Sequence, residues 1–187
     1  MDLPWGEERT KQFVTNVGLI TSNGPYGYNI MACEWTHHVS YSPGLISISI
    51  RKNDATHANI SKTKEFGVNL CASDQNAISS ISGVNSGKTV NKIEALKELG
   101  YKFFKARKID VWMVEGAAMN AECKLFKKII LSDHTMFIGE VAELYPVTGK
   151  EPLLYHNQKY WKIGENIQKP PEDELARIRK IIEKHKK

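Results

Sequence analysis

Alternating apolar and polar residues run through much of the chain and predict a protein built mainly of β-strands. In residues 45–50, LISISI, the side chains of Ile46, Ile48 and Ile50 fall on one side, and those of Ser47 and Ser49 fall on the other. This two-residue period is typical of a strand with one buried face. Further strands are expected at residues 66–72, 110–118, 120–131 and 135–147. Two hairpins are also expected, one joining residues 13–24 to 27–35 and one across residues 153–163, with Asn157 and Gln158 near its turn.

Helical periodicity is limited to three segments. A short helix is expected through residues 56–64, with Asp54 or Thr56 as its N-cap. A second is expected within residues 87–100, which end on a glycine and carry apolar side chains at helical spacing: Val90, Ile93, Leu96 and Leu99. The last segment begins with prolines and acidic residues and ends with cations, and its apolar stripe consists of Leu175, Ile178 and Ile182. Its charge order and its stripe both favour an amphipathic helix.

The predicted fold class is mainly β with helical connections, arranged as one antiparallel β-barrel. The strands outnumber the helices, and the helices fall between strands without alternating regularly with them. A length of 187 residues suits a single domain. We expect this domain to occupy residues 1–170 and the amphipathic helix to occupy residues 171–187.

The composition narrows the class of partner. Hydrophobic residues make up 41% of the chain and charged residues 25%, which is an ordinary globular mixture. The formal net charge is +5, and residues 172–187 contribute to it with six Lys or Arg against four Asp or Glu. The remaining excess is too small to suggest nucleic acid as the main partner, whereas a smaller anion such as a phosphate group is compatible with it.

Membrane insertion and secretion are not expected from the sequence. No apolar run approaches the ~20 residues that span a bilayer. The opening residues, MDLPWGEERTKQF, contain acidic residues and no apolar signal region. Cys33, Cys71 and Cys123 are far apart and odd in number, which argues against a disulfide framework. Together these features favour a cytoplasmic, reduced protein.

Few side chains are candidates for direct catalysis. His37 and His38 are adjacent, and neighbours on a strand point to opposite faces, so both can hardly ligate one metal ion. There is no Gly-x-Ser-x-Gly motif, and Cys71 lies in a strand pattern that suits a small core residue. If the protein is an enzyme, we therefore expect a cofactor to supply the chemistry.

Two basic, hydroxyl-rich segments are candidates for binding a phosphate. Residues 82–89, SGVNSGKT, end in Gly-Lys-Thr, but their first glycine is too close for an ATP-binding P-loop. If residues 86–89 begin a helix, their backbone N–H groups would still favour an anion. Residues 51–60 offer a second such place, with Arg51 and Lys52 after a strand and Thr56 at the next helix start. Either stretch could instead be an ordinary solvated helix cap.

Ordered motifs over residues 13–164 resemble a known family. Residues 28–70, YNIMACEWTHHVSYSPGLISISIRKNDATHANISKTKEFGVNL, are similar to the flavin reductase-like domain, the FMN-binding split-barrel flavoproteins. Three later segments follow in the order typical of the family: SGVNSGKTVNKIEALKELGY, DHTMFIGEV and PLLYHNQKYWKIG.

The resemblance implies a six-stranded split barrel that forms a homodimer and holds FMN non-covalently near the dimer interface. It implies hydride transfer from NADH or NADPH through FMN to a small-molecule or protein electron acceptor, with the flavin rather than a side chain carrying the chemistry. By motif, the isoalloxazine would lie along Met31, Ala32, Cys33, Glu34, Trp35 and Thr36. Ser49 would lie near the ribityl chain, and the phosphate would lie near Arg51, Thr56, Ser86 and Lys88. His134 would stand near the cofactor mouth, either on the substrate side or as an ordinary strand histidine.

The sequence leaves three hypotheses open. The favoured one is an NAD(P)H:FMN oxidoreductase, a flavin or ferric reductase. The alternative is an FMN-binding electron carrier or storage protein without efficient NAD(P)H turnover. The third is a small barrel that binds single-stranded nucleic acid and no flavin, which would require a basic, aromatic strand face.

Overall fold

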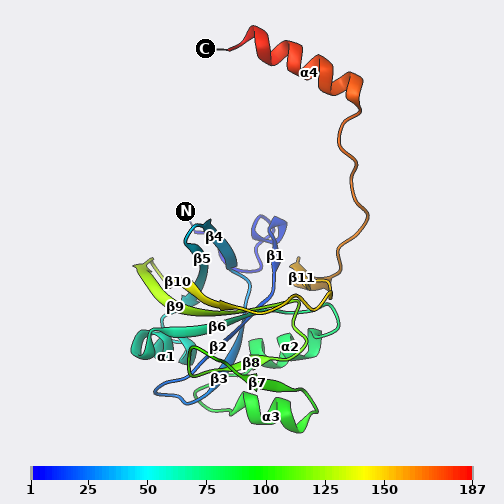
Figure 1. The fold of residues 1–187 in the computed structure, drawn as a ribbon. Helices are drawn as coiled ribbons and strands as arrows, with labels where there is room; N and C mark the ends of the chain where they lie inside the picture. Colours follow the sequence, from blue (N-terminus) through cyan, green and yellow to red (C-terminus); the bar gives the residue numbers. More distant parts are fainter. Residues whose placement is uncertain (1, 187) are drawn as a thin grey trace.

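In the computed structural model, which describes residues 2–186, a curled β-sheet forms the body and helices pack against it (Figure 1). The strands of the main sheet, in spatial order, are β3 (Asn29–Cys33), β2 (Gly18–Ser22), β6 (Glu65–Leu70), β9 (Met119–Ile130), β10 (His134–Leu144), β5 (Gly44–Arg51) and β4 (Thr36–Tyr41). A small sheet contains β1 (Val14–Asn16), β11 (Leu154–His156) and β12 (Lys159–Trp161), and a ribbon pairs β7 (Phe103–Lys105) with β8 (Trp112–Val114). The helices are a 3-10 turn (Thr10–Gln12), α1 (Ala55–Thr63), α2 (Asn76–Val84), α3 (Lys92–Glu98) and α4 (Glu172–Lys184).

The main sheet curls because its two edge strands are almost adjacent in the chain. β3 and β4 lie at opposite ends of the strand order, yet only Glu34 and Trp35 separate them in the sequence. The sheet must therefore bend until its edges approach each other, which produces a barrel that is open along one side. The predicted mainly β split barrel is thus confirmed. The main sheet has seven strands rather than six, because the residues of β4 pair with β5.

Strand β2 is buried on both faces and so belongs to two hydrophobic cores. Ile20 packs inside the barrel with Ile48, Phe66 and Phe137. Leu19 points the other way, into a cluster that includes Ile78 of α2 and Ile93 and Leu96 of α3. Each fully buried side chain of this size contributes roughly 1.5–3 kcal/mol. The outer face of β2 and β3 is therefore packed against α2 and α3, and their inner face is packed in the barrel core.

Most of the predicted strands are present. β5, β6, β9 and β10 lie within one or two residues of their expected starts. Ile46, Ile48 and Ile50 are buried, as the alternation in β5 predicts. The turn at Asn157 and Gln158 is also confirmed. Their φ values are 49° and 61°, and a two-residue type I′ hairpin turn requires positive φ at both central residues. The segment 110–118 was predicted as one strand, but only Trp112–Val114 is extended.

The helices agree less well with the sequence pattern. α1 begins as predicted after Asp54, and Gly100 adopts a φ of 90° beyond α3. The predicted helix start at residues 87–89 is wrong, because Asn91 caps α3 by accepting a hydrogen bond from the Glu94 N–H at 3.3 Å. Val90 and Leu99 are exposed, so the buried stripe of α3 contains only Ile93 and Leu96. Helix α2 and strand β4 were not predicted.

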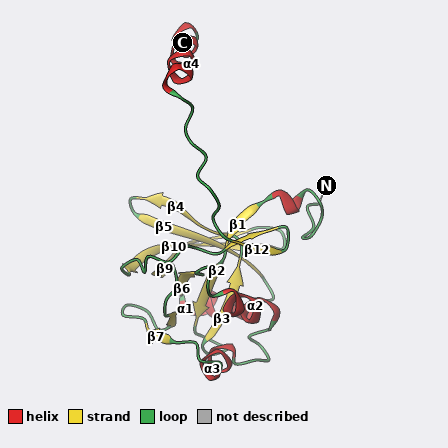
Figure 2. Ribbon diagram, turned by 90° about the vertical axis from the view of Figure 1, so that its right-hand side faces the viewer, coloured by secondary structure: helices red, strands yellow, loops and turns green. Residues whose placement is uncertain are grey.

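The C-terminal helix α4 stands away from the body. An extended segment, residues 162–171, connects it to β12, and Figures 1 and 2 both show the helix separated from the sheets. Within residues 2–186, no helix combines the length and the apolar character needed to cross a membrane.

A buried carboxylate holds the loop between β7 and β8 against the barrel. Glu122 of β9 is fully buried and accepts backbone N–H bonds from Arg107 at 2.7 Å, Lys108 at 2.7 Å and Ile109 at 3.1 Å. The Tyr145 hydroxyl donates to the same carboxylate. Burial and this hydrogen bond raise the pKa of Tyr145 to about 12. Such a group can stay buried because each oxygen has partners.

Replacing this carboxylate should destabilise the fold more than removing a surface charge does. We expect Glu122→Gln to lower the free energy of unfolding by about 2–4 kcal/mol. The NH₂ group of glutamine would face backbone N–H groups and cannot accept hydrogen bonds from them. Urea unfolding followed by circular dichroism measures this. Glu140→Gln, at an exposed position of β10, is the matched control and should change stability by less than about 0.5 kcal/mol. Equal effects of the two substitutions would contradict this role of Glu122.

Candidate functional site

The turn from β3 to β4 closes the barrel at one point. The Ser49 N–H of β5 donates to the Trp35 carbonyl at 3.1 Å, and the Thr36 hydroxyl donates to the Cys33 carbonyl at 3.1 Å. Gly18 of β2 lies directly beneath, where a Cβ atom would come within 2.3 Å of the Thr36 hydroxyl oxygen. A glycine is therefore required there for the turn to approach β2.

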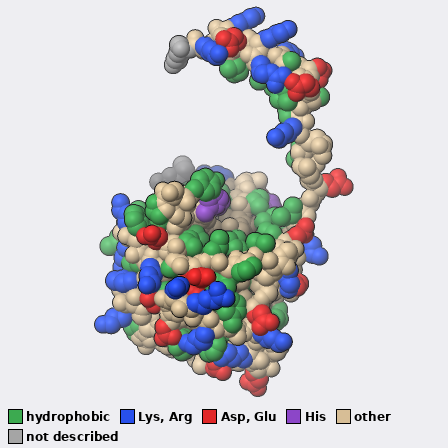
Figure 3. Space-filling model, in the orientation of Figure 1, with side chains coloured by type: hydrophobic (Ala, Val, Ile, Leu, Met, Phe, Trp, Pro, Cys, Tyr) green, Lys and Arg blue, Asp and Glu red, His purple; other side chains and the backbone are tan. Residues whose placement is uncertain are grey.

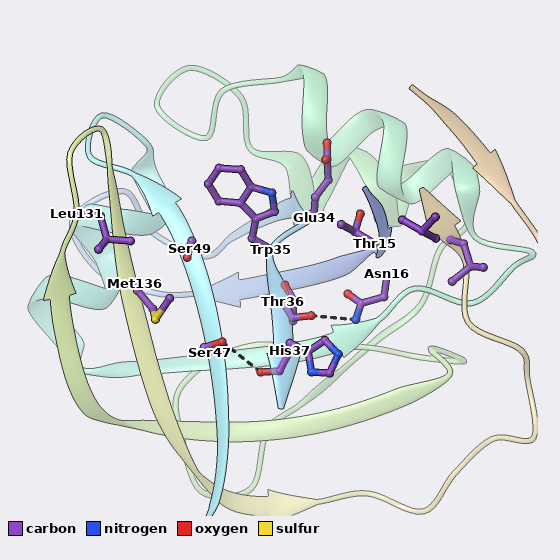
Figure 4. Close-up of a pocket in the computed structure, with 12 residues that line it drawn as sticks. Thr15, Asn16, Glu34, Trp35, Thr36, His37, Ser47, Ser49, Leu131 and Met136 are labelled. Atoms are coloured by element: carbon purple, nitrogen blue, oxygen red, sulfur yellow. Dashed lines mark hydrogen bonds between the residues drawn. The ribbon is translucent and has the colours of Figure 1, made fainter. Parts of the chain in front are cut away.

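A cavity of about 610 Å³ opens beside this turn (Figure 4). Glu34, Trp35, Thr36 and His37 come from the turn and the start of β4, and Ser47 and Ser49 come from β5. The remaining lining residues are Val14, Thr15, Asn16, Leu131, Met136 and Leu154. The cavity thus combines polar side chains, among them the hydroxyl groups of Ser47 and Ser49, with apolar ones such as Leu131 and Met136, as is common for a site that holds an organic ligand.

Aromatic and charged side chains meet at the mouth of the cavity. The rings of Trp35 and His134 lie 4.6 Å apart, and His134 Nδ1 is 3.0 Å from a carboxylate oxygen of Asp133. The adjacent His134 imidazole lowers the pKa of Asp133. Arg51 lies opposite His134 in the pairing of β5 with β10. His134, which sequence analysis placed near a cofactor mouth, contacts Trp35, a residue of the cavity wall.

Glu34 is the acidic group of the cavity wall. Burial raises the pKa of its carboxyl group, against a hydrogen bond from Trp5 and the attraction of Arg51. The Trp5 indole N–H donates to Glu34 at 3.3 Å, which brings the N-terminal segment over this side of the cavity.

A second polar cluster lies where β3 and α1 begin. The Asn29 side-chain NH₂ donates to the Thr56 hydroxyl at 2.8 Å. Its carbonyl oxygen, Oδ1, is buried and has no hydrogen-bond partner among residues 2–186. Gly87 sits against this oxygen, and a Cβ atom at that position would come within 2.2 Å of it. A buried acceptor without a partner is costly, so this oxygen is suited to meeting a donor from a ligand.

The candidate phosphate residues do not all lie together. Gly87 brings the loop that contains Ser86 and Lys88 close to Thr56 and Asn29, and the Lys88 ammonium lies 5.7 Å from the centre of the Tyr26 ring. Ser86 and Lys88 lie in a turn between α2 and α3 and not at a helix N-terminus, so no helix dipole contributes there. Arg51 lies instead at the cavity rim, at the end of β5.

The six residues of the predicted ring segment face different ways. Glu34, Trp35 and Thr36 line the cavity, whereas Cys33 is buried and its thiol lies 3.5 Å from the Ser49 carbonyl oxygen. Met31 packs against the barrel core, and Ala32 packs in the cluster beneath α2. Within residues 2–186, β3 is an edge strand, so one row of its backbone N–H and C=O groups is not paired to another strand.

Several lining residues were not identified from the sequence. Ser47 shares a strand face with Ser49, so the alternation in β5 could have identified it. Met136 faces Ser49 across the β10–β5 ladder, a register that no local pattern reveals. Asn29 carries the unpartnered oxygen of the second cluster but lacks any distinctive local motif.

The curled sheet with its open edge places the protein among split-barrel folds. Residues 10–164 match the family model described as flavin reductase like domain. The chain therefore belongs to the flavin reductase-like family, whose members are oxidoreductases that act on flavin.

Known relatives agree with this assignment. An NADH-dependent FAD reductase of Streptomyces globisporus is 24% identical over 155 residues, which cover 79% of each chain. A protein of Pyrococcus abyssi is 28% identical over 113 residues, which cover 60% of this chain and 63% of that one.

Solved structures share the fold at low sequence identity. The NADH:FAD oxidoreductase of Streptomyces globisporus, in complex with NAD and FAD fragments, has a TM-score of 0.75 and 20% identity and covers 90% of this chain and 100% of that chain. The flavoredoxin of Methanosarcina acetivorans has a TM-score of 0.76 and 21% identity, with coverages of 88% and 93%.

The residues present fit a flavin nucleotide. The unpaired edge of β3 offers backbone groups to a polar ring edge, and Ser49 offers a hydroxyl beside it. The unpartnered Asn29 oxygen could accept a hydrogen bond from a ribityl hydroxyl, and Thr56 and Lys88 provide donors for a phosphate.

The cysteines should not take part in redox chemistry. All three are buried, and desolvation raises the pKa of Cys71 to about 12, that of Cys123 to about 12, and that of Cys33 above its ordinary value. A thiol with a raised pKa supplies little of the reactive thiolate. We expect Ellman's reagent at pH 8 to leave all three unmodified in the folded protein and to titrate all three after unfolding. Lys102→Cys, at an exposed position, is the positive control. Rapid labelling of a native thiol would contradict this expectation.

Proposed function

We propose that the protein is an NAD(P)H:FMN oxidoreductase that binds FMN in the split of the barrel. The observation that carries this proposal is the cavity beside the β3–β4 turn, with Ser47 and Ser49 on one wall and Trp35 and His134 at its mouth. The family assignment supports a flavin, and the Streptomyces relatives named as NADH-dependent or NADH:FAD reductases support a nicotinamide nucleotide.

We propose an orientation of FMN that extends from the cavity beside the β3–β4 turn to the polar cluster of Asn29 and Thr56. The isoalloxazine would lie along residues 31–36, mainly against backbone groups, with Ser49 near the ribityl chain. Thr56, Ser86 and Lys88 would bind the phosphate around Asn29, and Arg51 would contribute charge from the rim. When bound, the flavin would accept a hydride from the nicotinamide and pass electrons to an acceptor.

The residues around the cavity would prepare this transfer. Val14, Leu131, Met136 and Leu154 would exclude water from the reacting face. Nδ1 of His134 lies beside Asp133, which leaves Nε2 as the nitrogen for a substrate, and the contact with Trp35 holds the ring in place. Glu34 would disfavour additional negative charge near the ring whenever its carboxyl group is ionised.

A homodimer is part of this proposal. Figure 3 shows hydrophobic side chains gathered around a hollow on the face of the body that is turned toward α4. Exposed apolar residues on the strands and turns around the cavity include Val14, Trp35, Val39 and Leu131. An exposed apolar surface around a polar site is typical of an interface between protein chains.

An electron carrier is the second candidate, because the flavoredoxin of Methanosarcina acetivorans shares the fold. The open cavity mouth would also suit exchange of electrons with a protein. The two candidates differ in whether NADH or NADPH reduces the bound flavin rapidly.

Anaerobic mixing tests the proposed activity. We expect the FMN-loaded protein to lose its flavin absorbance near 450 nm, a property of the flavin, within seconds of adding NADH or NADPH, and to turn over when ferricyanide or free flavin is added. Free FMN with the same nucleotide is the control. Flavin binding with no reduction by either nucleotide would favour the carrier, and the absence of flavin binding would reject both functions.

Binding of the FMN phosphate should depend on Lys88, near the polar cluster of Asn29 and Thr56, and on Arg51, at the end of β5. We expect Lys88→Ala and Arg51→Ala each to weaken FMN binding by about 5- to 50-fold, the loss of one charge-assisted contact, with little change in the melting temperature. Fluorescence quenching of FMN measures this affinity. Riboflavin, which lacks the phosphate, should bind the variants and the original protein alike.

Lys102→Ala is the matched control, since it removes an exposed lysine away from both clusters. It should leave FMN affinity unchanged within about twofold. If Lys88→Ala and Lys102→Ala behave alike, the phosphate lies elsewhere.

A further inference from the structure

The C-terminal helix α4 exposes an apolar stripe without a partner. The linker residues 162–171 are all exposed, and both views of the fold show α4 apart from the sheets (Figures 1 and 2). Ile178 is 42% exposed and Ile182 is 60% exposed. An amphipathic helix of this kind usually gains its stability by covering the apolar face.

The spacing of the stripe suits one other helix. Leu175, Ile178 and Ile182 are separated by three and then four residues, which is the a–d–a spacing of a helix pair. Ile181, which is 45% exposed, lies beside this stripe, and Arg177, Arg179 and Lys180 lie around it.

The charges along α4 indicate which helix fits and in which direction. The first turn is acidic, with Glu172, Asp173 and Glu174. The second half is mainly basic, with Arg179, Lys180 and Lys184 against Glu183, and Lys186 follows the end of the helix. Two copies side by side in opposite directions would place each acidic end against a basic end. Two copies in the same direction would place like charges together.

We propose that α4 pairs in antiparallel orientation with α4 of a second copy of this chain. A two-fold axis between the helices makes the contact self-complementary, with Leu175 near Ile182 of the other copy. This contact goes beyond the proposed flavin chemistry and does not depend on it.

The linker allows such a contact between two folded bodies. Its ten residues can span roughly 33 Å when extended. A helix of 13 residues is marginal alone, but a dimer formed through the bodies would raise the effective concentration of the second helix. The pairing would then connect the two chains at a place separate from the cavity.

Disulfide mapping in the full chain tests the pairing and its direction. The double variant Leu175→Cys with Ile182→Cys carries new thiols on α4, and the three native thiols are buried. After mild oxidation we expect a cross-linked dimer whose proteolytic peptides join position 175 of one chain to position 182 of the other. Peptides that join 175 to 175 and 182 to 182 would overturn the antiparallel arrangement.

A matched pair of serine substitutions tests whether the stripe is the contact. Added to the cysteine variant, Ile178→Ser should reduce the cross-linked fraction by at least about fivefold, whereas Ala176→Ser, on the other side of the helix, should change it less than about twofold. Equal effects would overturn the proposal. Cross-links from α4 to the body would also overturn it, and so would loss of the dimer cross-link on adding anionic phospholipid vesicles that bind α4.

The outcome is separable from the flavin proposal. Ile178→Ser alone should leave FMN affinity and nucleotide oxidation unchanged, because α4 lies outside the cavity. Normal flavin reduction with no helix cross-link would reject only the pairing. A helix cross-link in a protein that binds no flavin would reject only the flavin chemistry.

Discussion

The hydrogen bond from the Ser49 amide to the Trp35 carbonyl is the constraint on which the site depends. It joins β5 to the turn of Glu34 and Trp35, through which the chain passes from β3 to β4, the two edge strands of the main sheet. On one side of this bond β4 continues along β5. On the other side β3 diverges from β5, and its outer backbone groups are left without a strand partner. A barrel that closed along its full length would satisfy those groups itself and leave no room for a flavin.

The edge strand β3, which borders this opening, is held in place by packing on both of its faces. β3 has the barrel core on one face and α2 on the other, with Met31 and Ala32 directed into these two layers. The side chains of β3 thus anchor the strand, while its backbone faces the site. Recognition through the backbone makes few demands on side-chain identity. Chains that share only 20% or 21% identity with this one keep the same fold.

The sequence was most informative where side-chain pattern and burial have the same period. The Ile and Ser alternation of β5 identified the strand and its buried face, whereas Ser49 was named as a site residue by the family resemblance. It failed for α2, whose serine-rich residues 76–84 have weak helix propensity and form a helix mainly because Ile78 is buried in the outer core. It also placed a helix start at residues 87–89, since Val90 and Leu99 mimic a buried stripe although both are exposed. The contacts of Met136 and Asn29 could not be predicted, because they depend on strand register and on the meeting of distant segments.

The anchoring of the β7–β8 loop by Glu122 has a consequence for how freely this surface can vary. The carboxylate binds the backbone N–H groups of residues 107–109 and makes no demand on the side chains of Arg107 and Lys108 for that purpose. Evolution could exchange those side chains without loosening the loop. Proline is the exception, since it has no N–H to donate. Substitutions in this loop would therefore lose side-chain contacts such as that of Arg107 with Glu143 but keep the backbone anchor, in contrast to the turn at Trp35, where a single added Cβ on Gly18 would collide with Thr36.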